Sequence, residues 1–274
     1  MRLATLRRGD ETVAVLIEGG RAYELGATDV GECLHTHGWA ERYSTMGSSS
    51  IAADEADLAA VIPSPGKILC LGLNYSGHIS EMGRATPDFP TVFPKFADAL
   101  VGPRDPILIP SVSAQVDWEA ELAVVIGRPI YRAGHAEAKA AIAGFTVMND
   151  ISMRDWQART TQWFQGKTFG SSTPLGPWLV TPDEVDWAQD LLIRCLVDGE
   201  VVQEARTSEH VFGPADAASY ISTFTRLSPG DVIALGTPSG VGVARTPPRF
   251  LVPGQVVRTE IEGIGALENL CIAE

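Results

Sequence analysis

Two glutamates two residues apart, Glu119 and Glu121, are the first candidates for chemistry in this chain. They lie in Val116–Ile126, where apolar residues alternate with other residues as in a β-strand that has one face against a core. The core fixes the register of such a strand, so we expect both acids on the opposite face. Strand residues two apart are separated by roughly 6.5–7 Å, so both carboxylates can converge on one ion.

Asp150, which follows the apolar run Phe145–Met148, supplies a third candidate carboxylate. Three carboxylates with no nearby cysteine or histidine favour a hard divalent cation, Mg²⁺, Mn²⁺ or Ca²⁺, over zinc. A lone Glu-x-Glu is more often a solvated strand face, so that alternative stays open on these residues alone.

His78 and Glu81 form a second candidate group. If residues 74–83 make a helical turn, the two side chains are neighbours on one face. A glutamate that accepts a hydrogen bond from one imidazole nitrogen orients the ring and makes the other nitrogen a better base. The pattern therefore indicates a general base, with an ordinary surface pair as the alternative.

A third group follows Asp150. Ser152 can cap a helix that runs through Trp163, and on it the spacing of Asp150, Arg154 and Gln157 aims all three at one site. Arginine offers a planar fork for a carboxylate and glutamine offers an amide. A surface helix with an exposed arginine is the alternative.

Lys167 lies in Gly166-Lys167-Thr168, which invites a phosphate-loop interpretation. We reject that interpretation because the upstream glycine and the strand-loop-helix context are absent. A solvated loop lysine is then the alternative to a catalytic one. The chain has only four lysines, and Lys95 ends a proline-rich stretch, residues 84–95, that we expect to be a loop. We assign no catalytic role to Lys95.

The elements that must position these residues are mostly strands. Residues 12–17 and 21–25 flank a Gly-Gly turn, and residues 191–197 and 200–203 flank Asp198-Gly199, which predicts two hairpins. We also expect strands at 67–73, 107–110 and 232–235, and helical segments at 30–45, 52–61, 137–143 (with Gly144 as its cap) and 214–225. The 232–235 strand ends in a Gly-Thr-Pro loop whose backbone can approach a ligand closely.

Two prolines and a glycine in Ile62–Gly66 mark the best domain boundary. We expect a small N-terminal domain, residues 1–62, and a catalytic domain, residues 63–274. The 274 residues carry a net charge of −13, which argues against nucleic acid and anionic membrane as partners. Four scattered cysteines and charges near the N-terminus, where a signal peptide needs an apolar run, predict a cytoplasmic protein. No apolar run reaches membrane-spanning length.

From Lys67 onward the motifs together resemble those of the fumarylacetoacetate hydrolase family. They are Asn-Tyr-x-x-His-x-x-Glu from Asn74 to Glu81, Asp-Trp-Glu-Ala-Glu from Asp117, Asn-Asp-Ile-Ser from Asn149, Gly-Lys-Thr-Phe from Gly166 and Gly-Thr-Pro from Gly236. Many relatives carry an acid where this chain has Gly170, which puts the partner of the neighbouring lysine in question.

The resemblance implies an α+β, mostly β fold, in which mixed sheets form a roll around the site, and a homodimer. It implies metal ligation by Glu119, Glu121 and Asp150, and catalysis by His78, Glu81 and Lys167. It assigns substrate binding to Tyr75, Arg154, Gln157 and Thr237.

The implied reaction is divalent-metal-dependent hydrolysis of a C–C bond in an acylpyruvate-type substrate, a small anionic 2-oxo acid of the kind met in aromatic catabolism. In it, the cation stabilises an enolate while His78 activates water. The same parts serve an isomerase of a 2-hydroxydienedioate or an oxaloacetate decarboxylase. A metal-dependent phosphoryl-transfer enzyme and a non-catalytic metal-binding protein are more distant alternatives, the first lacking a phosphate loop and the second not requiring the His78–Glu81 pair.

Overall fold

The computed structural model describes residues 1–45, 47 and 49–274, and it is mostly β-structure. Its largest sheet contains eleven of the described strands. They are β1 (Arg2–Arg8), β2 (Glu11–Glu18), β3 (Arg21–Glu24), β4 (Ser50–Ala52), β5 (Ile68–Gly72), β6 (Thr91–Lys95), β7 (Leu100–Val101), β10 (Ala120–Ile126), β11 (Ile142–Asn149), β13 (Thr173–Val180) and β16 (Val232–Ala234). The order is β4-β3-β2-β1-β13-β11-β10-β16-β5-β6, and β7 pairs with β13. The sheet is mixed because β5–β16 and β7–β13 are parallel.

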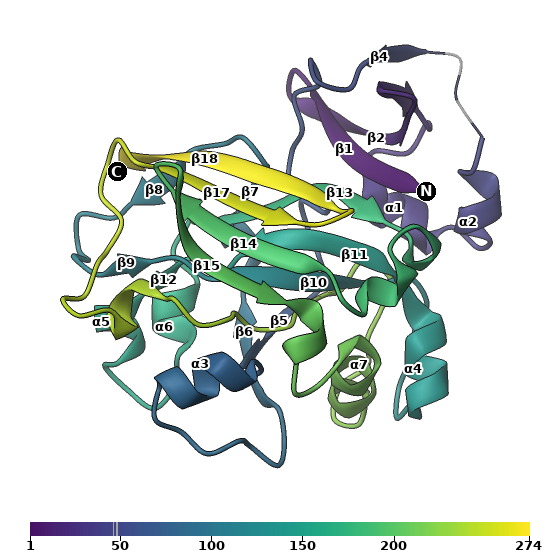
Figure 1. The fold of residues 1–274 in the computed structure, drawn as a ribbon. Coiled ribbons are helices and arrows are strands. Elements are labelled where there is room, and N and C mark those ends of the chain that lie inside the picture. Colours follow the sequence, from purple (N-terminus) through teal and green to yellow (C-terminus); the bar gives the residue numbers. More distant parts are fainter. Residues whose placement is uncertain (46, 48) are drawn as a thin grey trace.

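A second sheet of five described strands packs against the middle of the first (Figure 1). It contains β8 (Ile107–Ile109), β14 (Leu192–Val197), β15 (Glu200–Arg206), β17 (Val256–Ile261) and β18 (Gly265–Ala273). The short strands β9 (Val116–Asp117) and β12 (Ser152–Met153) pair separately. The predicted α+β, mostly β fold with mixed sheets is therefore confirmed.

The two sheets enclose the main apolar core. Leu122 and Val124 of β10 and Phe145 of β11 belong to it, together with Ile193 of β14 and Leu267 of β18. The opposite face of β10 is also buried, since Ala123 and Val125 join a second apolar cluster. The alternation along residues 116–126 thus separates two buried faces, rather than a buried face from a solvated one.

The helices are short. They are α1 (Val30–His35), α2 (Trp39–Arg42), α3 (Ser76–Glu81), α4 (His135–Ala141), α5 (Arg154–Gln157), α6 (Phe164–Lys167) and α7 (Pro214–Ser222), with 3-10 turns at Ala97–Ala99, Pro182–Glu184, Asp186–Ala188, Thr207–Glu209 and Gly242–Ala244. In Figure 1, α4 and α7 lie side by side, and Ser219 of α7 donates to the Ala133 carbonyl at 2.8 Å. No helix in the described part of the chain is long and apolar enough to cross a membrane.

The helix predicted from Ser152 through Trp163 is wrong. Ser152 and Met153 instead form β12, because they pair with Asp117 and Val116 of β9. Only Arg154–Gln157 then forms a helix, and a separate helix, α6, begins at Phe164. A strand pairing with residues far away in sequence has overridden the local helical spacing.

Three other local predictions need correction. Residues 52–61 contain no helix, and Thr91–Lys95 is not a loop but the edge strand β6. Pro94 is tolerated there because β6 is the last strand in the described part of the sheet and pairs there with β5 alone. Gly144 is not a helix cap: it lies within β11, where an added Cβ would collide with the Val180 carbonyl of β13.

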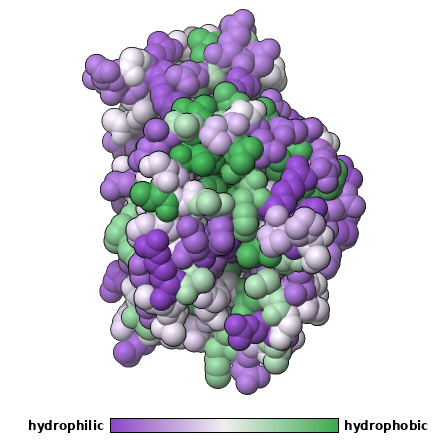
Figure 2. Space-filling model, turned by 90° about the vertical axis from the view of Figure 1, so that its left-hand side faces the viewer, coloured by the Kyte–Doolittle hydropathy of each residue, from purple (hydrophilic) through white to green (hydrophobic). Residues whose placement is uncertain are grey.

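The N-terminal strands continue the large sheet, because Arg2 and Leu3 of β1 pair with Val180 and Leu179 of β13. Figure 1 shows this segment at the upper right, beside the main body. The boundary at residue 62 stays a prediction, as does the homodimer. Figure 2 shows the side that lies at the left of Figure 1, where hydrophobic side chains gather in a strip between hydrophilic ones.

Candidate active site

Strand pairing brings the three predicted metal ligands together. β10 and β11 are antiparallel with Ala120 opposite Asn149, and the Asp150 amide donates to the Glu119 carbonyl at 2.8 Å. One carboxylate oxygen from each of Glu119, Glu121 and Asp150 lies within 4.8 Å of the others. All three side chains are buried, so they are not a solvated strand face.

Two buried lysines contact these carboxylates. The Nζ of Lys167 lies 2.5 Å from Glu119 Oε2 and 2.9 Å from Asp150 Oδ2. The Nζ of Lys95 lies 2.5 Å from Asp150 Oδ1. Lys167 therefore has two acidic partners without any contribution from residue 170, and Gly170 is an exposed position.

Arg154 links the carboxylate cluster to a fourth acid, Asp117. Its Nε donates to Asp117 Oδ2 at 2.8 Å, and its Nη1 lies 2.7 Å from Glu119 Oε1. The same Nη1 donates to Gln157 Oε1 at 3.0 Å, which orients the glutamine so that its amide nitrogen is free to donate. The Nη2 of Arg154 is buried and has no partner among the described residues, which suits an incoming carboxylate.

The cluster has unequal charges. Four buried carboxylates, those of Asp117, Glu119, Glu121 and Asp150, face three cations, those of Lys95, Arg154 and Lys167. With every group ionised, one negative charge is left over, and the pKa directions below locate it at Glu121.

Burial raises the pKa of Glu119, but Lys167 and Arg154 outweigh it and hold that pKa at about 2. Burial, then the charges of Asp150 and Glu119, raise the pKa of Glu121 well above its ordinary value. Burial lowers the pKa of Lys167, yet Asp150 and Glu119 leave it raised, so the ammonium stays charged.

These residues fit a divalent cation. The oxygen donors converge, and Glu121 has no cationic partner among the described residues, while its Oε2 accepts only from the Gly236 amide at 2.8 Å. An added positive charge next to Glu121 would remove the repulsion that raises its pKa. An oxygen-only donor set of this kind suits Mg²⁺, Mn²⁺ or Ca²⁺.

The predicted contact between His78, the candidate general base, and Glu81 is present. The Nδ1 of His78 lies 2.9 Å from Glu81 Oε2 on α3, and Glu81 Oε1 accepts from the Gly240 amide at 2.9 Å. Burial raises the pKa of Glu81, but its hydrogen bonds to His78 and Gly240 leave it lowered, so the carboxylate is anionic. Nδ1 is thus the donor to Glu81, which leaves Nε2 as the basic nitrogen.

Thr237 lies where the resemblance predicts it, at the wall of the cavity. A buried glutamine holds it: Gln203 Nε2 donates to Thr237 Oγ1 at 2.8 Å and to the Pro238 carbonyl at 2.9 Å. Gln203 Oε1 accepts from the Ala120 amide at 2.9 Å, so the Gly-Thr-Pro loop is tied to the strand that carries Glu121.

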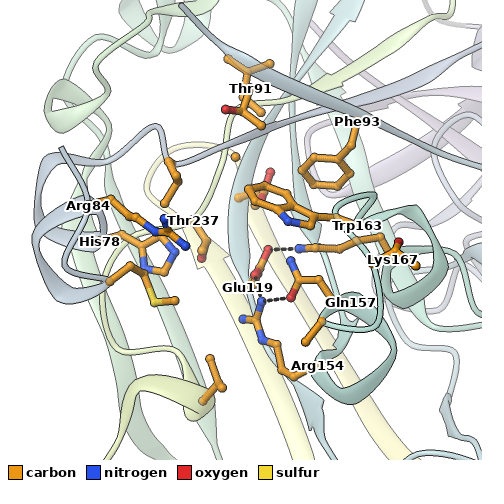
Figure 3. Close-up of a pocket in the computed structure, with 18 of the residues that line it drawn as sticks. His78, Arg84, Thr91, Phe93, Glu119, Arg154, Gln157, Trp163, Lys167 and Thr237 are labelled. Carbon is orange, nitrogen blue, oxygen red and sulfur yellow. Dashed lines mark hydrogen bonds and ion pairs between the residues drawn. The ribbon is translucent and has the colours of Figure 1, made fainter. Parts of the chain in front are cut away.

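A cavity of about 550 Å³ unites these groups, and its walls include His78, Glu119, Glu121, Arg154, Gln157, Lys167 and Thr237. Figure 3 shows His78 on one side and Arg154, Gln157 and Lys167 on the other. Aromatic rings of Phe93 and Trp163 cover part of the wall. Gly72 allows this, since a Cβ there would collide with the Trp163 ring.

Of the four residues predicted to bind substrate, Tyr75 alone does not line this cavity. Its side chain is 1% exposed, and its ring packs on His210 with centroids 4.4 Å apart. Its hydroxyl is buried without a partner among the described residues. These contacts support a packing role, and substrate contact by Tyr75 stays a prediction.

Sequence reasoning gave no role to several residues of the site, among them Lys95, Asp117 and Gly166. Lys95 lies at the end of β6, which places it against Asp150, and the only feature of the sequence that pointed to it was the small number of lysines. Asp117 was visible only as one more acid on the strand, without its arginine partner. Gly166 was read as part of a loop motif, whereas a Cβ there would collide with the backbone at Gln157, so the glycine lets α6 pack on α5.

The geometry agrees with a family comparison. The family model described as fumarylacetoacetate (FAA) hydrolase C-terminal matches residues 67–271. The chain belongs to the fumarylacetoacetate hydrolase family. The chain is therefore a member of an enzyme family, as predicted, and the match begins close to the expected boundary.

Two curated relatives are similar to most of this chain. An oxaloacetate tautomerase of Xenopus laevis, named as mitochondrial, is 46% identical over 221 residues, which cover 80% of this chain and 69% of that one. A human oxaloacetate tautomerase, also named as mitochondrial, is 46% identical over 78% of this chain and 69% of its own length. The prediction of a cytoplasmic protein, made from the scattered cysteines and the charged N-terminal residues, is wrong on this comparison, because these relatives are named as mitochondrial.

Solved structures cover the whole chain. A 5-carboxymethyl-2-hydroxymuconate delta-isomerase from Mycobacterium smegmatis is 33% identical with a TM-score of 0.82, covering 100% of this chain and 99% of that one. A fumarylacetoacetate hydrolase from Exiguobacterium antarcticum is 30% identical with a TM-score of 0.88, covering 100% of both chains. Family members with this fold thus carry both isomerase and hydrolase names.

Proposed function

We propose that this protein is a tautomerase that interconverts the enol and keto forms of a small anionic 2-oxo acid of the oxaloacetate type. The observation that carries the proposal is the placement of one base, His78, across the cavity from Arg154, Gln157 and Lys167. Tautomerisation needs one group that moves a proton at carbon and cations that stabilise charge on oxygen. The 46% identity to oxaloacetate tautomerases supports the substrate class.

Substrate is held by its carboxylate and its oxo oxygen. The unpartnered Nη2 of Arg154 and the amide of Gln157 donate to the 2-carboxylate. The Lys167 ammonium, already charged, faces the oxo oxygen. Glu119, Glu121 and Asp150 would hold a divalent cation, which when bound supplies Lewis-acid stabilisation of negative charge on substrate oxygens.

His78 carries the proton. In the keto-to-enol direction its Nε2 takes a proton from C3, the C–H pair becomes the C2–C3 double bond, and the carbonyl pair moves to O2. O2 then takes a proton from water, and the hydroxide that remains takes the proton from His78, which returns the base to its neutral form. In the other direction, His78 returns the proton to C3. Glu81 keeps the ring oriented and stabilises the imidazolium while the proton is on it.

C–C hydrolysis of an acylpyruvate, the reaction we expected from the sequence, is the second candidate. His78 and Glu81 are also the device that would activate a water molecule, and the fumarylacetoacetate hydrolase from Exiguobacterium antarcticum shares the fold. Hydrolysis requires an ordered water between His78 and a carbonyl, in addition to the parts that tautomerisation needs. We therefore place it second.

The test follows enol-oxaloacetate and an acylpyruvate by ultraviolet absorbance, with Mg²⁺, with Mn²⁺ and with excess chelator. We expect metal-dependent acceleration of enol decay with no pyruvate formed, and loss of the acceleration in His78→Asn. Ser80→Ala, on the same helix, is the matched control. Cleavage of the acylpyruvate without enol turnover would replace the tautomerase with the hydrolase.

As further parts of the proposal, we expect a homodimer and no nucleic-acid or membrane partner. The net charge of −13 is consistent with the absence of such partners.

A further inference from the structure

Arg84 lies on the cavity wall but has no part in the arrangement described above. Figure 3 shows its side chain beside His78, across the cavity from Arg154, Gln157 and Lys167. The chain reaches this position just after α3, the helix that carries the His78–Glu81 pair. Arg84 is thus a second cationic group, at the opposite end of the cavity from the first.

The backbone at Arg84 is held in place by the end of α3. The Arg84 amide donates to the Ile79 carbonyl at 3.0 Å, and the Gly83 amide donates to the Ser80 carbonyl at 3.0 Å. Gly83 has a φ of +62°, so the two bonds form a Schellman motif, which favours glycine at this residue. The position of Arg84 is therefore coupled to the helix of the base, although its side chain extends into an open space.

The other cations of the cavity are already neutralised. Lys167 contacts Glu119 and Asp150, and Arg154 contacts Asp117 and Glu119. Arg84, by contrast, forms no ion pair and no side-chain hydrogen bond with the described residues. Its full charge is available to an anion inside the cavity.

The wall around Arg84 offers little else to a charged group. Met82 and Ala85, which are close to Arg84 in the chain, and Leu73 are apolar residues of the cavity lining. A second carboxylate placed against these side chains would lose its hydration without compensation. A guanidinium offers such a carboxylate a two-pronged, charge-assisted contact.

We propose that Arg84 binds the second carboxylate of a dicarboxylic 2-oxo acid and so selects dicarboxylic over monocarboxylic substrates. This inference rests on the proposed function and adds the substrate class. The 2-carboxylate lies at Arg154 and Gln157, the reacting carbon lies between, and the far carboxylate lies at Arg84, on the same side as His78. Arg84 is a specificity residue, because it contacts substrate away from the reacting atoms.

The experiment compares Arg84→Met and Arg84→Lys with the wild type. Oxaloacetate and pyruvate are titrated by calorimetry into Mg²⁺-loaded protein, and kcat/KM is measured for the enols of oxaloacetate and phenylpyruvate. We expect Arg84→Met to weaken oxaloacetate binding about tenfold and to leave pyruvate binding unchanged. Arg84→Lys should recover part of the loss. Arg42→Met, on α2, removes the same charge far from the cavity and is the control.

The two proposals fail in different ways. If the wild type binds oxaloacetate better than pyruvate, and this preference depends on Arg84, the inference stands even when no enol turnover is found. If the wild type turns over enol-oxaloacetate but Arg84→Met keeps the full dicarboxylate preference, the inference is overturned and the tautomerase stands. A wild type without any preference also overturns it.

Discussion

The Nε of Arg154 donates to Oδ2 of Asp117 at 2.8 Å, and neither side chain is more than 9% exposed. Asp117 accepts three further hydrogen bonds, from the amides of Trp118, Gly242 and Val243 at 2.7–3.0 Å. One carboxylate therefore joins the arginine of the site to the loop after the Gly-Thr-Pro motif. Removing its charge leaves a buried guanidinium with one acidic partner fewer.

We therefore expect Asp117→Asn to lower the free energy of unfolding by about 3 kcal/mol, the usual cost of breaking a buried pair from one side. It should also raise KM, because Arg154 is no longer held toward the cavity. Urea denaturation and steady-state kinetics check both effects. Asp155→Asn, which removes the charge of a half-buried acid bonded to Ser113, is the control and should change stability much less. Equal losses in both variants would contradict the special position of Asp117.

Glu81→Gln tests the orientation of the base. The single amide oxygen can accept from His78 or from Gly240 but not from both, and the neutral side chain no longer stabilises an imidazolium. We expect kcat for enol turnover to fall by about 10²-fold while KM changes little, since Glu81 does not line the cavity. A change in KM alone would show that the pair serves binding rather than proton transfer.

Glu121→Gln tests the metal site through its effect on protein stability, first without and then with Mg²⁺. Without metal, the variant should be at least as stable as the wild type, because it removes a carboxyl group whose pKa is raised by burial and then by the charges of Asp150 and Glu119. Adding Mg²⁺ at 100 times its Kd should stabilise the wild type by about 2.7 kcal/mol and the variant hardly at all. Thermal denaturation with Mg²⁺ and with chelator measures both effects, and the surface variant Glu262→Gln is the control. Equal Mg²⁺ stabilisation of wild type and Glu121→Gln would exclude Glu121 as a ligand.

We expect His210, which lies outside the site, to make the stability of the fold depend on pH. Burial lowers its pKa to about 4 from the ordinary 6.5, and its Nε2 is buried without a partner among the described residues. Below pH 6.5 the unfolded chain gains the proton more readily than the folded one. The stability that the neutral His210 side chain contributes is therefore fully present above about pH 6.5 and is lost as the pH falls toward 4.

The full pKa difference corresponds to about 3 kcal/mol, and we expect about 2 kcal/mol because the residue as a whole is only partly buried. In His210→Gln, the fall in unfolding free energy between pH 6.5 and 4 should be smaller by that amount. His37→Gln, an exposed histidine in the N-terminal segment, provides the comparison. A pH profile in His210→Gln that matches the wild type would contradict this assignment.

Local pattern alone predicted much of the site. Alternation along residues 116–126 put Glu119 and Glu121 on one face, and a spacing of three on a helical turn put His78 beside Glu81, as the structure has them. Both relations depend only on the repeat of a strand or helix, which a few consecutive residues determine. The position of Asp150 after an apolar run added the third carboxylate, and the family motif added Lys167, whose ammonium lies 2.9 Å from that carboxylate.

Tertiary structure decided the rest. Residues 152–153 form a strand because β9 lies next to them, and that pairing ends the helix that their own spacing favours. Lys95 reaches Asp150, 55 residues away, because the order of strands in the sheet places β6 at the cavity. Arg84 reaches the cavity because it follows the turn at Gly83 that comes after the end of α3. Local sequence sets which face of an element a residue occupies, whereas the partner of that face depends on which distant strands become neighbours.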